Sequence, residues 1–335
     1  MTIKKLTVIM AAGTILLAGA IGIAIQLTRP DEMKIDLPQK ENGAVVSVDG
    51  SQTTLTDMEN IPLYYGETER LLLPLRNVME GLGGTVEWDR QTKETKIAYK
   101  GKTLSLRAGE AEATLNGYEV LLPAEAESIN GCLYGDAELL SAYFTDDISF
   151  DIDTGQVTLQ AKDPSMPILA KGLLEEEGER SYRIEVPVFL GLNDSPYEKS
   201  LNASLRQELE AYAEACLEAA EEAGALHLRL EAGLADKDFF SLWWEGKADG
   251  ERVHLTKNID LMGQKAVDLS QMLTKESFAM VEEAAGEGWT AEDFSLTADG
   301  RLVLLHRGEG ISLQYWNGEA QPLTWKQSYR ELLEG

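Results

Sequence analysis

Four aspartates that precede a glycine are the first group of residues in this chain that could do chemistry. Closely spaced carboxylates of this kind open a calcium-binding loop, in which they supply oxygen ligands to the ion. The residues are Asp146, Asp147, Asp151, Asp153 and Gly155. The other ligands of such a loop, including a closing glutamate, are missing from the sequence that follows. A hairpin turn is therefore the better interpretation, and we predict no metal site and no cofactor.

His254 is the second candidate, because a histidine can act as a general acid or base near neutral pH. Glu251 and Asp260 lie close to it in the sequence. No serine nucleophile, metal motif or pair of catalytic carboxylates accompanies them. We therefore predict a surface histidine on a strand, no catalytic residue and no enzyme activity. The other histidines, His227 and His306, are too far away in sequence to complete a zinc motif.

Two pairs of adjacent aromatic residues offer binding chemistry. Each pair lies in an expected strand, where neighbouring side chains point to opposite faces. One ring of each pair should then be in the core, while the other could stack on a sugar or anchor a protein partner. The predicted ligand contacts are Trp243, Trp244, Tyr315 and Trp316.

The charge of the chain excludes some partners. It has 57 acidic and 30 basic residues, for a net charge of −27. Residues 1–30 contain three basic residues and no acidic one, so the remainder has 27 basic and 57 acidic residues, a net charge of −30. Such a charge repels nucleic acid and anionic lipid headgroups and attracts cationic partners. It also keeps a protein soluble, which is the alternative explanation.

Two cysteines, Cys132 and Cys216, define no disulfide framework. An oxidising exterior would allow a bond between them. We expect them in different domains and interpret them as two buried free thiols, and the sequence leaves their pairing open.

An apolar segment near the N-terminus predicts where the protein is located. The run from Leu6 to Leu27 contains no charged residue. A helix of that length rises about 33 Å, enough to cross a hydrocarbon core of about 30 Å. We expect an uncleaved single-pass anchor at residues 6–27, with Lys4 and Lys5 inside and the rest of the chain outside the cell. The alternative is a signal peptide cleaved near Ala20, which would release a secreted protein.

Two stretches of the next part of the chain are similar at one fixed offset of 62 in numbering. The offset aligns Leu71 with Leu133, Val78 with Leu140, Leu82 with Phe144, Val86 with Ile148, Trp88 with Phe150, Asp89 with Asp151 and Ile97 with Leu159. One offset that holds over so many positions indicates a duplicated unit. Apolar spacing within each copy predicts a short helix followed by a hairpin.

Three segments of this region resemble a known family. They are VVSVDG (45–50), LLLPLRNVMEGLGGTVEWD (71–89) and ATLNG (113–117). They look like the copper amine oxidase N-terminal-like domain, often called a stalk domain, which is common in surface proteins of Gram-positive bacteria. The resemblance covers residues 44–161. It implies a spacer or a wall-associated adhesive module, because in that family the module lies outside the catalytic core and carries no copper ligands. The second copy departs from the family pattern, with Tyr134-Gly135-Asp136 in place of the Pro-Leu-Arg step.

Strands and helices alternate in the last part of the chain. The strongest helix is expected at residues 200–224, with one face formed by Leu201, Leu205, Leu209, Tyr212, Cys216 and Ala220. A second helix is expected at about 275–285, and a final short one at 327–333. Asp299-Gly300 and Asn317-Gly318 predict two hairpin turns.

This part resembles a second family. The resemblance rests on YRIEVPVFLGL (182–192), NIDLMGQKAVDLSQML (258–273) and DFSLTADGRLVLLHRGEG (293–310). They are similar to the domain of unknown function in the extracellular part of RsiV-type anti-sigma factors, which also occurs in PdaC-type peptidoglycan deacetylases. Some relatives bind lysozyme through this region, so the resemblance implies lysozyme or peptidoglycan as a partner. The Gly-Gly-Ala-His step of those relatives is absent here. An anti-sigma role is not expected, because only a few residues precede the apolar segment.

Together these observations predict an α+β protein of the bacterial cell envelope. The predicted segments are an anchor (1–30), a tether (31–43), a stalk domain (44–161), a linker (162–181) and an RsiV-like domain (182–335). The expected function is non-catalytic binding of a cell-wall glycan or of a cationic protein such as lysozyme. The alternative is a structural spacer with no small-molecule ligand.

Overall fold

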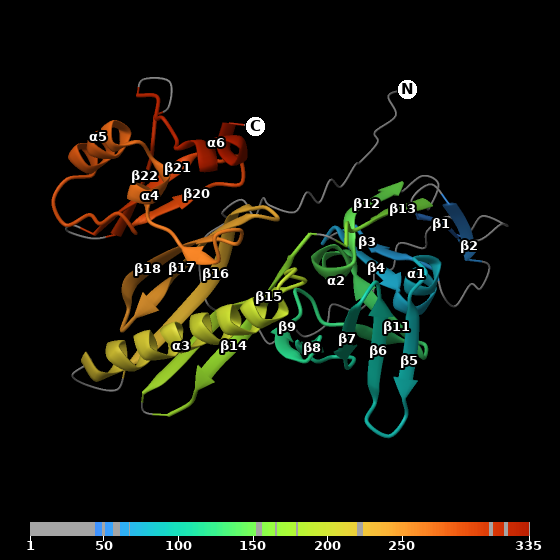
Figure 1. Cartoon of the computed structure of the whole chain (residues 1–335). Coiled ribbons are helices and arrows are strands. Elements are labelled where there is room, and N and C mark those ends of the chain that lie inside the picture. The colour runs from blue at the N-terminus through green and yellow to red at the C-terminus, as the bar shows by residue number, and fades with distance from the viewer. Residues whose placement is uncertain are drawn as a thin grey trace. The chain divides into compact units, whose positions relative to one another are not determined.

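The computed structural model describes residues 44–48, 51–55, 61–66, 68–151, 156–164, 166–178, 180–219, 224–307, 311–317 and 321–334 (Figure 1). The chain divides into two compact units, residues 1–164 (unit 1) and 165–335 (unit 2). Both mix strands with helices, which confirms the α+β class. The expected anchor at residues 6–27 lies outside the described residues. Among the residues described, no helix has the length and apolar character needed to span a membrane.

Unit 1 contains two four-stranded sheets and one antiparallel meander. The first sheet has the order β12-β13-β1-β2, from Thr145–Asp151, Gln156–Ala161, Ala44–Val48 and Ser51–Leu55. The second has the order β10-β11-β4-β3, from Glu127–Ile129, Cys132–Asp136, Arg70–Pro74 and Leu63–Tyr65. The meander is formed by β5 (Thr85–Asp89), β6 (Glu94–Tyr99), β7 (Lys102–Leu106), β8 (Glu112–Leu115) and β9 (Tyr118–Leu121).

The structure repeats its elements at the offset seen in the sequence. Helices α1 (Leu75–Gly81) and α2 (Ala137–Tyr143) are related by this offset, and so are β4 and β11. β4 and β11 also pair with each other in antiparallel fashion. The two repeats therefore meet along this strand pair and share one sheet.

Local sequence explains the ends of these elements. Gly83 adopts φ +86°, the left-handed conformation that ends a helix, just beyond α1. α2 begins at an aspartate cap, because Asp136 accepts a hydrogen bond from the Glu138 backbone N–H. Asn116 and Gly117 have φ values of 51° and 89°, as a two-residue hairpin turn between β8 and β9 requires.

The main sheet of unit 2 is covered by one long helix. Its order is β19-β18-β17-β16-β15-β14, from Lys265–Ala266, Glu251–Asp260, Phe239–Ala248, Ala225–Ala235, Ser181–Leu190 and Ile168–Glu176. β15 and β16 are parallel, and α3 (Ser195–Ala219) makes the crossover between them. α3 packs against these strands and covers one face of the sheet (Figure 1).

Part of the segment predicted as a linker, residues 162–181, forms a strand. Ile168–Glu176 form β14, which pairs with β15 over its whole length. Its residues alternate between buried and half-buried positions up to Leu174. The acidic run that follows has a linker-like composition, although the strand before it closes one side of the core.

A smaller layer completes unit 2. The strands β20 (Phe294–Leu296), β21 (Leu302–Arg307) and β22 (Ile311–Tyr315) form a three-stranded sheet. They share a core with α4 (Leu269–Met272), α5 (Lys275–Ala285) and α6 (Gln327–Glu334). The hairpin expected around Asn317-Gly318 falls on residues of which 318–320 lie outside the described part of the chain. On either side of that gap, β22 pairs with β21, and Trp325 bridges to Leu273 and is buried in this core.

Candidate functional site

Two of the four predicted ligand-contact aromatics are core residues. Trp244 is 2% exposed, and its Nε1 donates a hydrogen bond of 2.7 Å to the Glu185 carbonyl. Trp316 is 9% exposed, and its Nε1 donates to the Gln321 carbonyl at 2.6 Å. Both rings are packed and satisfied inside the protein, so they are not available to a ligand.

The other two aromatics lie on the opposite faces of their strands. Trp243 is half-buried, and its ring lies so close to Gly233 that a Cβ there would be 2.7 Å from Cζ3. Tyr315 is 56% exposed, with the Arg301 guanidinium 5.6 Å from its ring centroid. They belong to different strands, β17 and β22. A ligand role for Trp243 or Tyr315 stays a prediction.

The prediction that His254 lies at the surface is wrong, because this residue is 5% exposed. Its neighbours Val253 and Leu255 pack against the core beneath α3. Since side chains alternate along a strand, His254 points to the other face, where β18 contacts β20 and β22. That second layer covers the histidine, and no local pattern around His254 indicates it.

The cysteines and aspartates can also be placed. Cys132 and Cys216 lie in different units, as expected, and no disulfide joins them. Both are half-buried rather than buried. Asp146 accepts a hydrogen bond from the Asp163 backbone N–H. Asp153 and Gly155 lie outside the described residues. Within the described parts of the chain, no three acidic, histidine or cysteine side chains are grouped to hold a metal ion.

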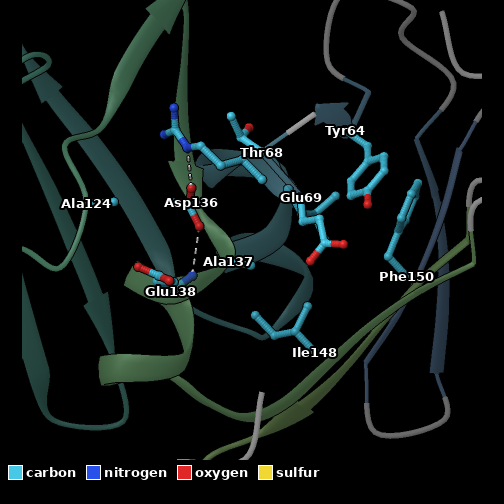
Figure 2. Close-up of a pocket in the computed structure, with 11 residues that line it drawn as sticks. Tyr64, Thr68, Glu69, Ala124, Asp136, Ala137, Glu138, Ile148 and Phe150 are labelled. Carbon is cyan, nitrogen blue, oxygen red and sulfur yellow. Dashed lines mark hydrogen bonds and ion pairs between the residues drawn. The ribbon is translucent and has the colours of Figure 1, made fainter. Parts of the chain in front are cut away.

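A pocket of about 280 Å³ lies where the two repeats of unit 1 meet. The first repeat contributes β3, β4 and the turn between them, and the second contributes the start of α2 and β12 (Figure 2). The lining residues include Tyr64, Glu69, Arg70, Asp136, Glu138 and Phe150. We call it the repeat-junction pocket.

A guanidinium held by two carboxylates forms one wall of this pocket. Arg70 Nε donates to Asp136 Oδ2 at 2.9 Å, and its Nη1 lies 3.1 Å from Glu127 Oε1. Desolvation alone would lower the pKa of Arg70, but Asp136 and Glu127 outweigh it and raise that pKa. Asp136 is 5% exposed and also caps α2. The positive charge of Arg70 is therefore already neutralised within the protein.

Two further carboxylates of the pocket, Glu69 and Glu138, have no such partner. Both are exposed, and neither is in an ion pair within the described residues. Partial desolvation and the nearby Asp136 raise the pKa of Glu138, against a smaller opposing effect of Arg70. Glu69 adopts φ +52° in the turn before β4, an uncommon conformation for a residue other than glycine. The pocket therefore carries a net negative charge.

The remaining wall is apolar. The rings of Tyr64 and Phe150 pack against each other with centroids 5.3 Å apart, and both are largely buried. Ile148 and Leu71 lie beside them. Figure 2 shows Glu69 between this aromatic pair and the start of α2. The pocket can hold a small ligand that joins an apolar part to a positive charge.

Unit 2 carries its own acidic surface on α3. Glu210, Glu214 and Glu218 are exposed and follow one another at every fourth position, so they lie on one face of the helix. We call these three residues the glutamate row. Desolvation raises the pKa of Tyr182, and Glu176, Glu210 and Glu214 raise it further. β14 and α3 therefore bring their carboxylates to the same region.

Residues 45–159 match the family model of the copper amine oxidase N-terminal domain. The resemblance expected for this stretch is thus confirmed. The matched stretch contains nearly all of both repeats and of unit 1 as described, including the described residues that line the repeat-junction pocket.

Two solved structures of the DUF3298 family are similar to this chain. One, from Bacteroides fragilis NCTC 9343, has 12% identity and a TM-score of 0.37, and the match covers 51% of this chain and 98% of that one. The other, from Pseudomonas aeruginosa PAO1, has 15% identity and a TM-score of 0.32, with 49% and 96% covered. No curated protein matches the chain.

The repeat-junction pocket and the ion pairs behind it were not predicted from the sequence. Asp136 before an apolar helix is a recognisable cap, and that signal was available. Its pairing with Arg70, which is 66 residues away, depends on β4 meeting β11 and has no local signature. The position of Glu69 likewise depends on the turn before β4, and the residues of that turn have no sequence pattern that predicts it.

Proposed function

We propose that this protein is a non-catalytic component of a bacterial cell envelope and that unit 2 binds a cationic protein, with lysozyme as the first candidate. One observation carries the proposal: the glutamate row is exposed on α3 and has no basic partner among the described residues. The neighbouring Glu208, in contrast, pairs with Lys257 at 2.6 Å. The match to a copper amine oxidase N-terminal domain supports the envelope location.

The charge of unit 2 supports the same proposal. Residues 165–335 contain 32 acidic and 16 basic residues, which gives a net charge of −16. Such a field speeds the encounter with a basic protein and disfavours acidic ones. Unpaired carboxylates on a helix surface can then pair with lysine and arginine side chains of the partner without first breaking internal ion pairs.

The location is part of the proposal. The apolar segment at residues 6–27 would anchor the chain in the cell membrane, or direct its secretion if it is cleaved near Ala20. Either route would place both units outside the cytoplasm, where lysozyme and peptidoglycan are found.

A retention experiment tests the proposed function. The purified full chain is incubated with immobilised hen lysozyme and, separately, with insoluble peptidoglycan, at low and at high salt. We expect retention on lysozyme that is lost at high salt, because exposed ion pairs are screened. Retention on peptidoglycan alone would replace this proposal with glycan binding. Retention on neither would favour the spacer interpretation.

A further inference from the structure

We infer that the repeat-junction pocket of unit 1 is a binding site for an alkylammonium group, whose positive charge pairs with Glu69 while its apolar stem lies against Tyr64 and Phe150. The inference concerns a different unit from the proposed function and stands independently of it. It rests on the charge, the apolar wall and the size of the pocket.

The charge balance of the pocket selects a cation. Among the described residues of the lining, Arg70 is the one basic side chain, and it is held by Asp136 and Glu127 at 2.9 and 3.1 Å. It cannot turn to Glu69 without leaving the buried Asp136 unpaired, which is costly. Glu69 therefore keeps an unmatched negative charge, and an anionic ligand would meet repulsion from both Glu69 and Glu138.

The apolar wall requires more than a bare ion. Tyr64 and Phe150 are 6% and 7% exposed, and Ile148 is 2% exposed. These side chains form a hydrophobic surface directly beside Glu69 (Figure 2). A methylene chain placed there would be removed from water, and burial of its apolar surface would stabilise the complex. A metal ion would not be stabilised by contact with this hydrophobic surface. Among the described residues, no group of three acidic, histidine or cysteine side chains is placed to bind one.

The geometry of the rings disfavours a sugar. A sugar stacks on an open aromatic face, whereas Tyr64 and Phe150 face each other at 5.3 Å with an interplanar angle of 36°. A volume of about 280 Å³ also suits a small group better than a glycan chain.

The test uses three probes of matched size on the full chain. Pentylammonium carries the charge and the stem, 1-pentanol has the stem alone, and pentanoate reverses the charge. Calorimetric titration should show binding of pentylammonium, at least about tenfold weaker binding of 1-pentanol, and none of pentanoate. Equal binding of the amine and the alcohol, or no binding of the amine, would overturn the inference.

Variants locate the site. Glu69→Gln should weaken pentylammonium binding about tenfold. Glu138→Gln should weaken it by a smaller factor of about two to three, because the Glu138 carboxylate lies farther from the ammonium group, on the other side of Ala137 (Figure 2). Glu112→Gln, an exposed glutamate of unit 1 outside the pocket, is the matched control and should bind like the wild type. An unchanged affinity in Glu69→Gln, with the fold intact by circular dichroism, would contradict the assignment.

A second pair of probes distinguishes the source of the amine. Nα-acetyl-lysine methylamide presents the same stem and charge within a peptide, and its Nε-acetylated form removes the charge. Tighter binding of the lysine peptide than of pentylammonium would indicate a peptide-borne amine, and weaker binding would indicate a free small amine. Substitution of the glutamate row on α3 by glutamine should leave the affinities for pentylammonium and for the lysine peptide unchanged. This inference and the proposed function can therefore fail separately.

Discussion

Leu73 of β4 pairs with Gly135 of β11, and these two residues occupy the same position in the two repeats. The flanking pairs, Leu72 with Asp136 and Pro74 with Tyr134, exchange under the repeat offset. The register therefore places a local two-fold relationship at the Leu73–Gly135 pair. It explains how two short repeats, neither large enough for a core of its own, bury their helices in one unit.

The two-fold relationship is not exact at its centre, because Leu73 of the first repeat corresponds to a glycine, Gly135, in the second. A substitution of Gly135 tests why a glycine stands there. A Cβ on Gly135 would lie 2.6 Å from Leu75 Cδ2 and 3.0 Å from Leu139 Cδ2, and both leucines are fully buried. Gly135→Ala should therefore destabilise the protein by about 1–3 kcal/mol through overpacking. Urea unfolding measures this, with the exposed Ser128→Ala as a control that stays within about 0.5 kcal/mol of the wild type. An unchanged midpoint for Gly135→Ala would argue against this packing.

Asp136 and Glu127 hold the same guanidinium, but we predict very different contributions. Asp136 is almost fully buried and caps α2, so Asp136→Ala should cost about 2–4 kcal/mol. The side chain of Glu127 is 41% exposed, and Glu127→Ala should cost less than about 1 kcal/mol. Chemical unfolding of both variants checks the ranking, and equal losses would contradict it.

Asn202 should contribute strongly to the packing of α3 against β15. Its side chain accepts a hydrogen bond from the Phe189 backbone N–H and donates one to the Phe189 carbonyl, both at 2.8 Å. Asn202→Ala would leave two buried backbone groups unsatisfied and should cost about 2–4 kcal/mol. The exposed Ser204→Ala on the same helix is the control. If thermal unfolding shifts no more for Asn202→Ala than for Ser204→Ala, this contact is not stabilising.

Tyr143 should make the stability fall at alkaline pH. Burial raises the pKa of Tyr143 to about 12 from its ordinary value of 10. The folded state therefore keeps this proton while the unfolded state loses it, so the contribution is complete below pH 10 and disappears as pH rises toward 12. The difference is about 2–3 kcal/mol. Tyr143→Phe should show a smaller loss of stability between pH 9.5 and 11 in urea titrations, and parallel curves for both proteins would refute the assignment.

The elements predicted best from the sequence were those with a strong local pattern. α5 runs from Lys275 to Ala285 as expected, because apolar spacing and a threonine cap define it. α1 and its repeat were visible because the same apolar positions recur at one offset. The hairpin at Asp299-Gly300, between β20 and β21, followed from turn chemistry alone.

The features that could not be predicted from the sequence depend on distant partners. The buried face of α3 includes the polar residue Asn202. Its burial is tolerated because its side-chain amide makes hydrogen bonds with the backbone of Phe189. His254 is buried by strands that come much later in the chain. The repeat-junction pocket exists because β4 pairs with β11, so residues from both repeats converge on a space that neither repeat defines alone.

The most direct test of the proposed function measures how lysozyme binding depends on salt. Equilibrium titrations with hen lysozyme at several salt concentrations would compare the full wild-type chain with Glu210→Gln/Glu214→Gln/Glu218→Gln. A control, Glu276→Gln/Glu282→Gln/Glu283→Gln, removes three exposed charges from α5 instead. We predict that only the α3 variant binds at least about tenfold more weakly and with a shallower salt dependence. Equal affinities and equal salt slopes for the two triple variants would contradict the assignment of α3 as the binding surface.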